Sequence, residues 1–231
     1  MNNLTGRWKN ILAEDKPWTG LWSHYVRCQC GGIRTVDANC PACSAPPYDL
    51  TPKVIELPSG EKHTLPATFQ GAEGRYEDYE LLSLMEREWK RPLPAASGSF
   101  VSGLSPRASM VIIYWTYFET RMRRLVSIGL ADLPSRVAKE LDDRYDTVKD
   151  HMTRLYQILY GVKYADDLNA VGATAIPGLL GEVHDCRNRF IHGEPKALSD
   201  ALVQRVVDSL FDEHEAWVKV FNRRISLKKA S

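Results

Sequence analysis

The sequence lacks the features that mark secreted, membrane-spanning and strongly basic proteins. Its first residues contain no apolar segment of the kind found in a signal peptide. The longest apolar run, Met110 to Phe118 with Thr116 inside it, is too short to span a bilayer. The 30 Lys and Arg residues balance 29 Asp and Glu, so a net charge of +1 gives no overall attraction for nucleic acid. These absences predict a cytoplasmic protein with no membrane partner.

Any contact with RNA would therefore depend on local clusters of positive charge. Such clusters occur at Arg121/Arg123/Arg124, at Arg187/Arg189 and at Arg223/Arg224 with Lys228/Lys229. A solvated helix face would explain each of them equally well.

The distribution of Pro, Gly and Cys divides the chain into two regions. Residues 17–70 are rich in these residues, whereas residues 105–226 are poor in Gly and Pro. One helical segment over 75–90 and a Pro- and Ser-containing linker over 91–99 lie between them. We therefore expect a zinc-ribbon-containing region over 1–70, a helix and linker over 71–104, and a helical domain over 105–231.

The second region carries the spacing of amphipathic helices. Ser105 and Pro106 are typical of an N-cap and a first helical residue, and an apolar stripe continues to about 128. Further helices are expected over 134–161, over 178–192 and from Ser199, as N-cap, to about 225, with a turn-rich segment around Gly172. The fold class predicted is mainly α: an antiparallel bundle of four to five helices with a small β domain at the N-terminal end.

Four of the five cysteines form two close pairs, Cys28/Cys30 and Cys40/Cys43. The second pair has the two-residue gap of a zinc knuckle, and Gly31 and Gly32 permit the turn that the first pair needs. Residues 53–65 read as an attached hairpin. The pattern predicts a zinc ribbon over about 24–70 with structural Zn²⁺. A redox pair and unrelated buried thiols are the alternatives, while Cys186 reads as a core thiol.

A second set of chemically active residues lies near the end of the 178–192 helix. Arg187 and His192 are five positions apart, Asn188 follows the arginine, and Gly193 and Pro195 end the helix. A fixed cation and an imidazole on one helix can perform acid–base chemistry on a phosphodiester without a metal ion.

The run from Arg187 to His192 resembles the R-x(4–6)-H signature of HEPN domains, all-helical domains found in prokaryotic toxins and CRISPR effector ribonucleases. The segment from Tyr114 to Val126 is similar to the first long helix of that family, which often carries a glutamate near the site, here Glu119. The resemblance covers about residues 105–226 and does not extend to the cysteine region.

The resemblance implies a metal-independent endoribonuclease that acts as a homodimer, with both motifs facing one cleft. His192 would serve as general base or acid, Arg187 would stabilise charge on the phosphorane, and Asn188 would orient the phosphate or the histidine. Glu119 and Arg123 are candidates for supporting roles. No cofactor is expected for catalysis, and DNA should resist because it lacks the 2′-hydroxyl. A toxin or phage-defence effector is implied, with an antitoxin or other partner to restrain it.

Other interpretations of the same residues stay open. Arg187 could pair with Asp185 or Glu194, and His192 could only cap a helix. In that case the protein would be a non-catalytic adaptor that binds a protein, a nucleotide or a nucleic acid. A zinc-dependent deaminase or hydrolase is disfavoured because no His-x-Glu motif lies near the cysteines and four cysteine ligands would leave no open position on the metal.

Overall fold

A computed structural model describes residues 11–12, 14–23, 25–49, 51–65, 73–93 and 103–230. Most of the predicted linker lies outside these residues. The described part is mainly helical, as predicted, with two small two-stranded sheets. The elements are η1 (Trp18–Leu21), β1 (Tyr25–Arg27), β2 (Ile33–Thr35), β3 (Lys53–Glu56), β4 (Lys62–Leu65), α2 (Tyr76–Lys90), α3 (Ser109–Leu130), α4 (Ser135–Arg144), α5 (Val148–Asp150), η2 (His151–Leu155), α6 (Tyr156–Tyr160), α7 (Tyr164–Ala170), α8 (Ile176–Ile191), η3 (Pro195–Ala197) and α9 (Asp200–Ala230).

The chain forms two compact units. The first unit comprises the described residues within 1–21 and 75–220, and the second comprises those within 22–74 and 221–231. The cysteine region therefore forms its unit together with the last residues of α9.

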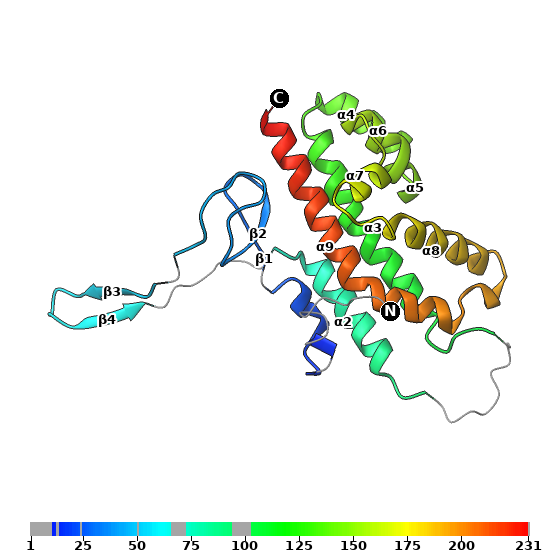
Figure 1. The fold of residues 1–231 in the computed structure, drawn as a ribbon, viewed down its shortest axis with the longest axis horizontal. Helices are drawn as coiled ribbons and strands as arrows, with labels where there is room; N and C mark the ends of the chain where they lie inside the picture. Colours follow the sequence, from blue (N-terminus) through cyan, green and yellow to red (C-terminus); the bar gives the residue numbers. More distant parts are fainter. Residues whose placement is uncertain are drawn as a thin grey trace. The chain divides into compact units, whose positions relative to one another are not determined.

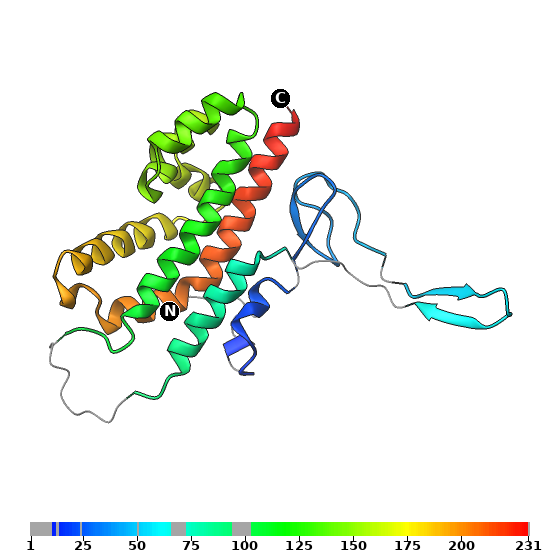
Figure 2. The same ribbon diagram turned by 180° about the vertical axis from the view of Figure 1, so that it is seen from behind.

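The first unit is built around α2, α3 and the α9 segment up to Val220, which lie side by side in both views (Figures 1 and 2). The apolar stripe predicted for α3 is mostly its buried face: Val111, Trp115, Phe118, Met122 and Leu125 are buried, whereas Ile112 of the same predicted stripe is half-buried. Burying such a stripe against neighbouring helices supplies the main driving force for this unit.

A polar layer crosses the centre of this helical core. Arg121 on α3 is fully buried and forms an ion pair with the fully buried Glu213 on α9. Beside it, the Tyr117 hydroxyl lies 3.0 Å from Nδ1 of His214, and Nε1 of Trp217 donates to the carbonyl of Arg121 at 3.1 Å. The two long helices are thus joined by polar contacts as well as by apolar packing.

Several predicted helix boundaries were wrong. The single helix expected over 134–161 is broken at Tyr145, where α4 ends, and resumes through α5, the π-helix η2 and α6. The turn-rich segment contains the helix α7. Ser105 caps a turn ahead of α3, because its hydroxyl accepts the N–H of Arg107 at 3.1 Å and donates to Asp200 at 2.6 Å.

The helix that carries the Arg187–His192 motif was predicted closely. It is α8, with His192 as its C-cap and Gly193 at a φ of +96°, a conformation that favours glycine. Ser199 lies at the start of α9, where its hydroxyl accepts the N–H of Leu202 at 3.4 Å, but α9 extends beyond the predicted end. Among the described residues no helix is both long enough and apolar enough to cross a membrane.

Two antiparallel hairpins form the strands of the second unit. β1 pairs with β2 in the register Tyr25↔Thr35, and β3 pairs with β4 in the register Lys53↔Leu65. The second pair confirms the hairpin predicted over 53–65. Its apolar side chains are exposed: Val54 is 62% and Ile55 40% accessible.

Candidate metal centre and candidate active site

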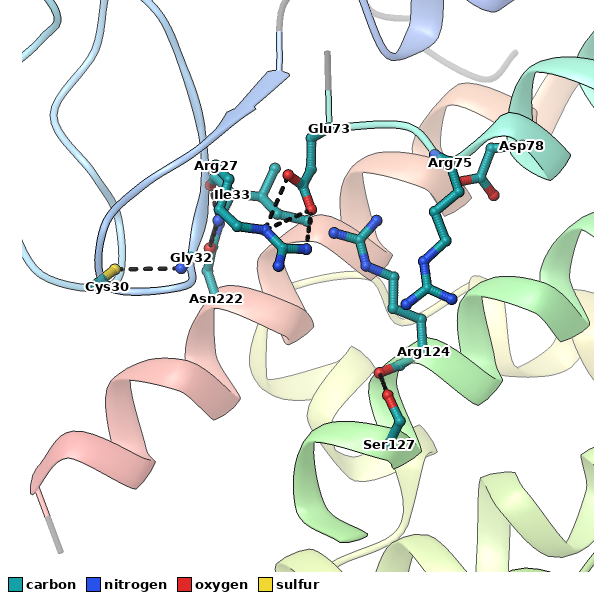
Figure 3. A network of polar contacts seen from close by, with 10 residues as sticks. All are labelled: Arg27, Cys30, Gly32, Ile33, Glu73, Arg75, Asp78, Arg124, Ser127 and Asn222. Carbon is teal, nitrogen blue, oxygen red and sulfur yellow. Dashed lines mark hydrogen bonds and ion pairs between the residues drawn. The ribbon is translucent and has the colours of Figure 1, made fainter. Parts of the chain in front are cut away.

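The first cysteine pair lies in the tight turn between β1 and β2. Cys28 directly follows β1, its N–H donates to the carbonyl of Gly32 at 2.8 Å, and its carbonyl accepts the N–H of Gly31 at the same distance. Gly31 has a φ of +90°, which a residue with a side chain rarely adopts. The turn brings the N–H of Gly32 to 3.3 Å from Sγ of Cys30 (Figure 3).

The second pair occupies a similar turn. The N–H of Cys40 donates to the carbonyl of Ala45 at 2.9 Å, and its carbonyl accepts the N–H of Ser44 at 2.8 Å. Ser44 has a φ of +58°. Each pair is therefore presented by a tight turn whose backbone groups are hydrogen-bonded.

The four thiols meet at one point. All four Sγ atoms of Cys28, Cys30, Cys40 and Cys43 lie within 4.8 Å of one another. Cys28 and Cys43 are 3.7 Å apart, and Cys30 and Cys40 are 3.6 Å apart. Thiolates bound tetrahedrally to one ion at about 2.3 Å lie about 3.8 Å from each other. The cluster therefore fits a four-coordinate metal ion, as predicted, and a complete set of four ligands leaves no position for a substrate.

The free thiols differ in acidity. Burial raises the pKa of Cys30 to about 12, whereas the backbone N–H of Ala45 helps lower the pKa of the exposed Cys43 to about 7. A bound cation would favour the thiolate form at every position.

A residue near the end of α9 is hydrogen-bonded to β2, the strand that follows the first cysteine pair. The buried side chain of Asn222 accepts the N–H of Ile33 at 2.7 Å and donates to its carbonyl at 2.6 Å (Figure 3). A Cβ on Gly32 would lie 2.9 Å from the Cβ of Ala42 and 3.0 Å from Oδ1 of Asn222. The glycine is thus required by space, and Asn222 fixes the strand that follows the first pair of ligands.

The candidate active site occupies the last turns of α8. A chain of hydrogen bonds starts at Arg187, whose Nη1 donates to Oδ1 of Asn188 at 3.1 Å. Nδ2 of Asn188 lies 3.1 Å from Nε2 of His184, and Nδ1 of His184 lies 3.0 Å from Oδ1 of Asp185. The site therefore contains an ordered polar row with a cation at one end and a carboxylate at the other.

The direction of every bond in this row follows from the donor-only arginine. Because the guanidinium can only donate, the Asn188 oxygen faces it and the amide nitrogen faces His184. Nε2 of His184 must then accept, and Nδ1 carries the hydrogen that is donated to Asp185. The ring of His184 also lies against Trp115 of α3, with 5.4 Å between ring centroids.

The structure brings some of the predicted residues together and leaves others apart. Arg187 and Asn188 are in direct contact, whereas His192 is exposed at the end of the helix. Within the described part of the chain no hydrogen bond or ion pair joins His192 to Arg187. Glu119 pairs with Arg123, one turn along α3, at 3.1 Å. A site that uses His192 and Arg187 together would need a bound substrate or a second chain to link them.

The alternative in which Arg187 pairs with Asp185 or Glu194 is wrong. Arg189, not Arg187, pairs with Glu194, and Asp185 pairs with His184. Nε of Arg187 is buried without a hydrogen-bond partner. An unsatisfied buried donor is uncommon in folded proteins, and a catalytic role, strain or a bound water or ion can account for it.

His184 is the residue that sequence reasoning passed over. It lies four positions before Asn188 and therefore on the same helix face, which is the signal that could have identified it.

The arginine clusters proposed for RNA contact are only partly available. Arg121 is fully buried in its ion pair with Glu213, and Arg124 and Arg224 are also buried. The expectation that these three cover a solvated helix face was wrong, because all three side chains are buried.

Comparison of the chain with protein-family models, with curated proteins and with solved structures found no match. The assignment of a function therefore depends on the two sites themselves.

Proposed function

We propose that this protein is a metal-independent endoribonuclease of the HEPN type, with its active site at the end of α8. The observation that carries the proposal is the row Arg187–Asn188–His184, which holds a guanidinium in place one turn before the exposed imidazole of His192. Preorganised donors of this kind stabilise charge that develops on a phosphoryl group.

The proposed reaction is a transesterification within RNA. The imidazole of His192 removes the proton from a ribose 2′-hydroxyl, and the 2′-oxygen attacks the adjacent phosphorus. The bond from phosphorus to the 5′-oxygen breaks, and that oxygen takes a proton from the histidine of a second copy. Arg187 stabilises the negative phosphorane oxygens, and Asn188 positions both the phosphate and the guanidinium.

A homodimer is part of the proposal, because one chain supplies a single His192 and the reaction needs a base and an acid. The exposed position of His192 supports it, as does Ile191 beside it, which is 54% accessible. An exposed apolar side chain next to a catalytic histidine suits a surface that a second copy covers. Glu119 and Arg123 keep a supporting role at most, since they pair with each other.

The proposal is tested by incubating the purified protein with single-stranded RNA in excess EDTA. We expect cleavage, and we expect His192→Ala and Arg187→Ala each to lower its rate by about 10²–10⁴-fold. His63→Ala is the matched control, because His63 is also an exposed histidine and lies on β4. Intact RNA, or equal rates for His192→Ala and His63→Ala, would overturn the assignment.

The biological role that we propose is that of a growth-arresting toxin or phage-defence effector, restrained by a partner protein. Expression of the parent protein should then arrest the growth of a bacterial host, whereas His192→Ala at the same abundance should not. Equal growth with both proteins would contradict this role.

For the four-cysteine cluster we propose structural zinc. Four thiolates at tetrahedral spacing are the ligands that zinc prefers in structural sites. Elemental analysis should find one zinc per chain in the parent and in Cys186→Ser, and none in Cys40→Ser. Retention of zinc by Cys40→Ser would contradict this assignment.

A non-catalytic adaptor is the second candidate, and the β3–β4 hairpin is the observation that favours it. Val54, Ile55 and Leu57 are exposed there, and exposed apolar side chains on a strand suit partner binding. This candidate predicts that His192→Ala keeps full cellular function while the double variant Val54→Ser/Ile55→Ser loses it.

A further inference from the structure

A second site lies in the first unit, away from the Arg187–His192 motif. It is a pocket of about 550 Å³, which is within the size range of small-molecule sites. The C-terminal half of α3, the end of α4, the start of η2 and the residue before α2 line it. The polar lining residues are Arg75, Arg123, Arg124, Ser127, Asp142, Asp143, Asp146 and His151.

His151 is the residue that points to a ligand. Only 3% of His151 is accessible to solvent, and both of its ring nitrogens lack a hydrogen-bond partner. The backbone of Tyr145 is near the ring but not in hydrogen-bond geometry. A buried polar group without a partner is costly, so a group that binds in the pocket and completes these bonds would be favoured.

The local backbone is unusual at the same residue. His151 begins η2, a π-helical turn inserted between α5 and α6. Such turns are rare and are found frequently at functional sites. They interrupt the regular spacing of the helix and so redirect the side chains that follow.

The charges around the pocket are separated by element. One side carries Arg75, Arg123 and Arg124, and Figure 3 labels Arg75 and Arg124. Among the described residues the Arg75 side chain makes no ion pair. Guanidinium groups donate charge-assisted hydrogen bonds to phosphate oxygens, so this side of the pocket suits an anionic group.

The other side carries the carboxylates of Asp142 and Asp143 at the end of α4 and of Asp146 after it. Carboxylates accept hydrogen bonds from hydroxyl and amino groups. Burial lowers the pKa of His151, with Asp142 and Glu119 opposing that shift and Arg123 adding to it, and this shift favours the neutral ring. A neutral ring offers one donor and one acceptor between the two charged sides.

From this arrangement we propose that the pocket binds a small phosphomonoester whose phosphate faces the arginines and whose hydroxyl or amino groups face the aspartates. A nucleoside monophosphate has this distribution of groups and this size. The site does not depend on the ribonuclease proposal, because neither Arg187 nor His192 lines it.

The test is a calorimetric titration of the full chain with AMP, and with adenosine as the probe that lacks the phosphate. We expect saturable AMP binding with a Kd below about 1 mM, and adenosine at least about tenfold weaker. Arg75→Gln and Arg123→Gln should each weaken AMP binding by about tenfold or more, because each removes a charge-assisted hydrogen bond. Both side chains are exposed, so both variants should fold.

Arg136→Gln is the matched control, since Arg136 is an exposed arginine on α4 that does not line the pocket. It should leave AMP binding unchanged. Absence of AMP binding, equal binding of adenosine, or an equal loss with Arg136→Gln would overturn the proposal. Binding of a single-stranded RNA that depends on Arg75 and Arg123, without AMP binding, would also overturn it and assign the pocket to nucleic acid. Because binding is measured and not cleavage, an inactive enzyme does not affect the result.

Discussion

Nε2 of His184 accepts a hydrogen bond from the side-chain amide of Asn188, one helical turn further along α8. The orientation of the amide is set by Arg187, which can only donate to the Asn188 oxygen. The histidine is therefore held as the tautomer with hydrogen on Nδ1, and its donor faces Asp185. One arginine thus fixes the orientation of the Asn188 amide and the tautomer of His184.

This relationship predicts the tautomer of His184 in solution. Long-range ¹⁵N–¹H spectra of histidine-labelled protein should show Nδ1 protonated and Nε2 unprotonated. Asn188→Ala removes the donor to Nε2, so the tautomers of His184 should become mixed in that variant. A parent spectrum with hydrogen on Nε2 would contradict the direction of the row.

Two glycines should respond in opposite directions to the same substitution. Gly32→Ala places a methyl group 2.9 Å from the Cβ of Ala42, so it should cost about 1–3 kcal/mol of unfolding free energy and weaken metal binding. Gly181 lies in α8 with open space around it, so Gly181→Ala should stabilise by about 0.5–1 kcal/mol. Denaturant unfolding measures both, and an equal effect of the two substitutions would refute the packing argument.

The hydrogen bonds of the Asn222 amide should stabilise the protein more than the size of the side chain does. Asn222→Asp keeps the size of the side chain but cannot donate to the carbonyl of Ile33. We expect a loss of about 1–3 kcal/mol, because the buried carbonyl loses its partner and faces a carboxylate. Asn39→Asp, at an exposed position of the same unit, is the control and should have little effect. Thermal unfolding of the metal-loaded protein distinguishes the two variants.

The stability of the protein should fall when either charge of the buried Arg121–Glu213 ion pair is removed alone, and less when both are removed together. Arg121→Met leaves a buried carboxylate without its cation and should destabilise by about 3–5 kcal/mol. The double variant Arg121→Met/Glu213→Leu removes both charges and should recover most of that loss. Arg136→Met, which breaks an exposed pair with Glu140, should cost less than about 1 kcal/mol. A double variant as unstable as Arg121→Met would contradict this account.

Much of the fold could be predicted from the sequence wherever local signals agree. The apolar stripe on α3, the C-cap at Gly193 and the hairpin over 53–65 each depend on residues close together in the chain. The four metal-site cysteines were equally readable, because their spacing matches the chemistry of one ion.

What could not be predicted depends on contacts between distant residues. Arg121 resembles a surface residue until Glu213, on another helix, is known to face it. Asn222 gives no sign in the sequence that it binds Ile33, because 189 positions separate them. The break at Tyr145 and the π-helical turn at His151 likewise follow from packing, which overrides local helix propensity.

The chemical ends of the RNA fragments test the central claim most directly. Attack by a 2′-hydroxyl predicts a 2′,3′-cyclic phosphate on one fragment and a 5′-hydroxyl on the other, formed equally in EDTA. A substrate with a single 2′-deoxynucleotide at the cleavage position should remain intact there. Mass spectrometry that found these ends with the parent protein, and none with His192→Ala, would support the Arg187–His192 site. Fragments with 5′-phosphate ends, or cleavage that stops when metal is chelated while the protein stays folded, would contradict it.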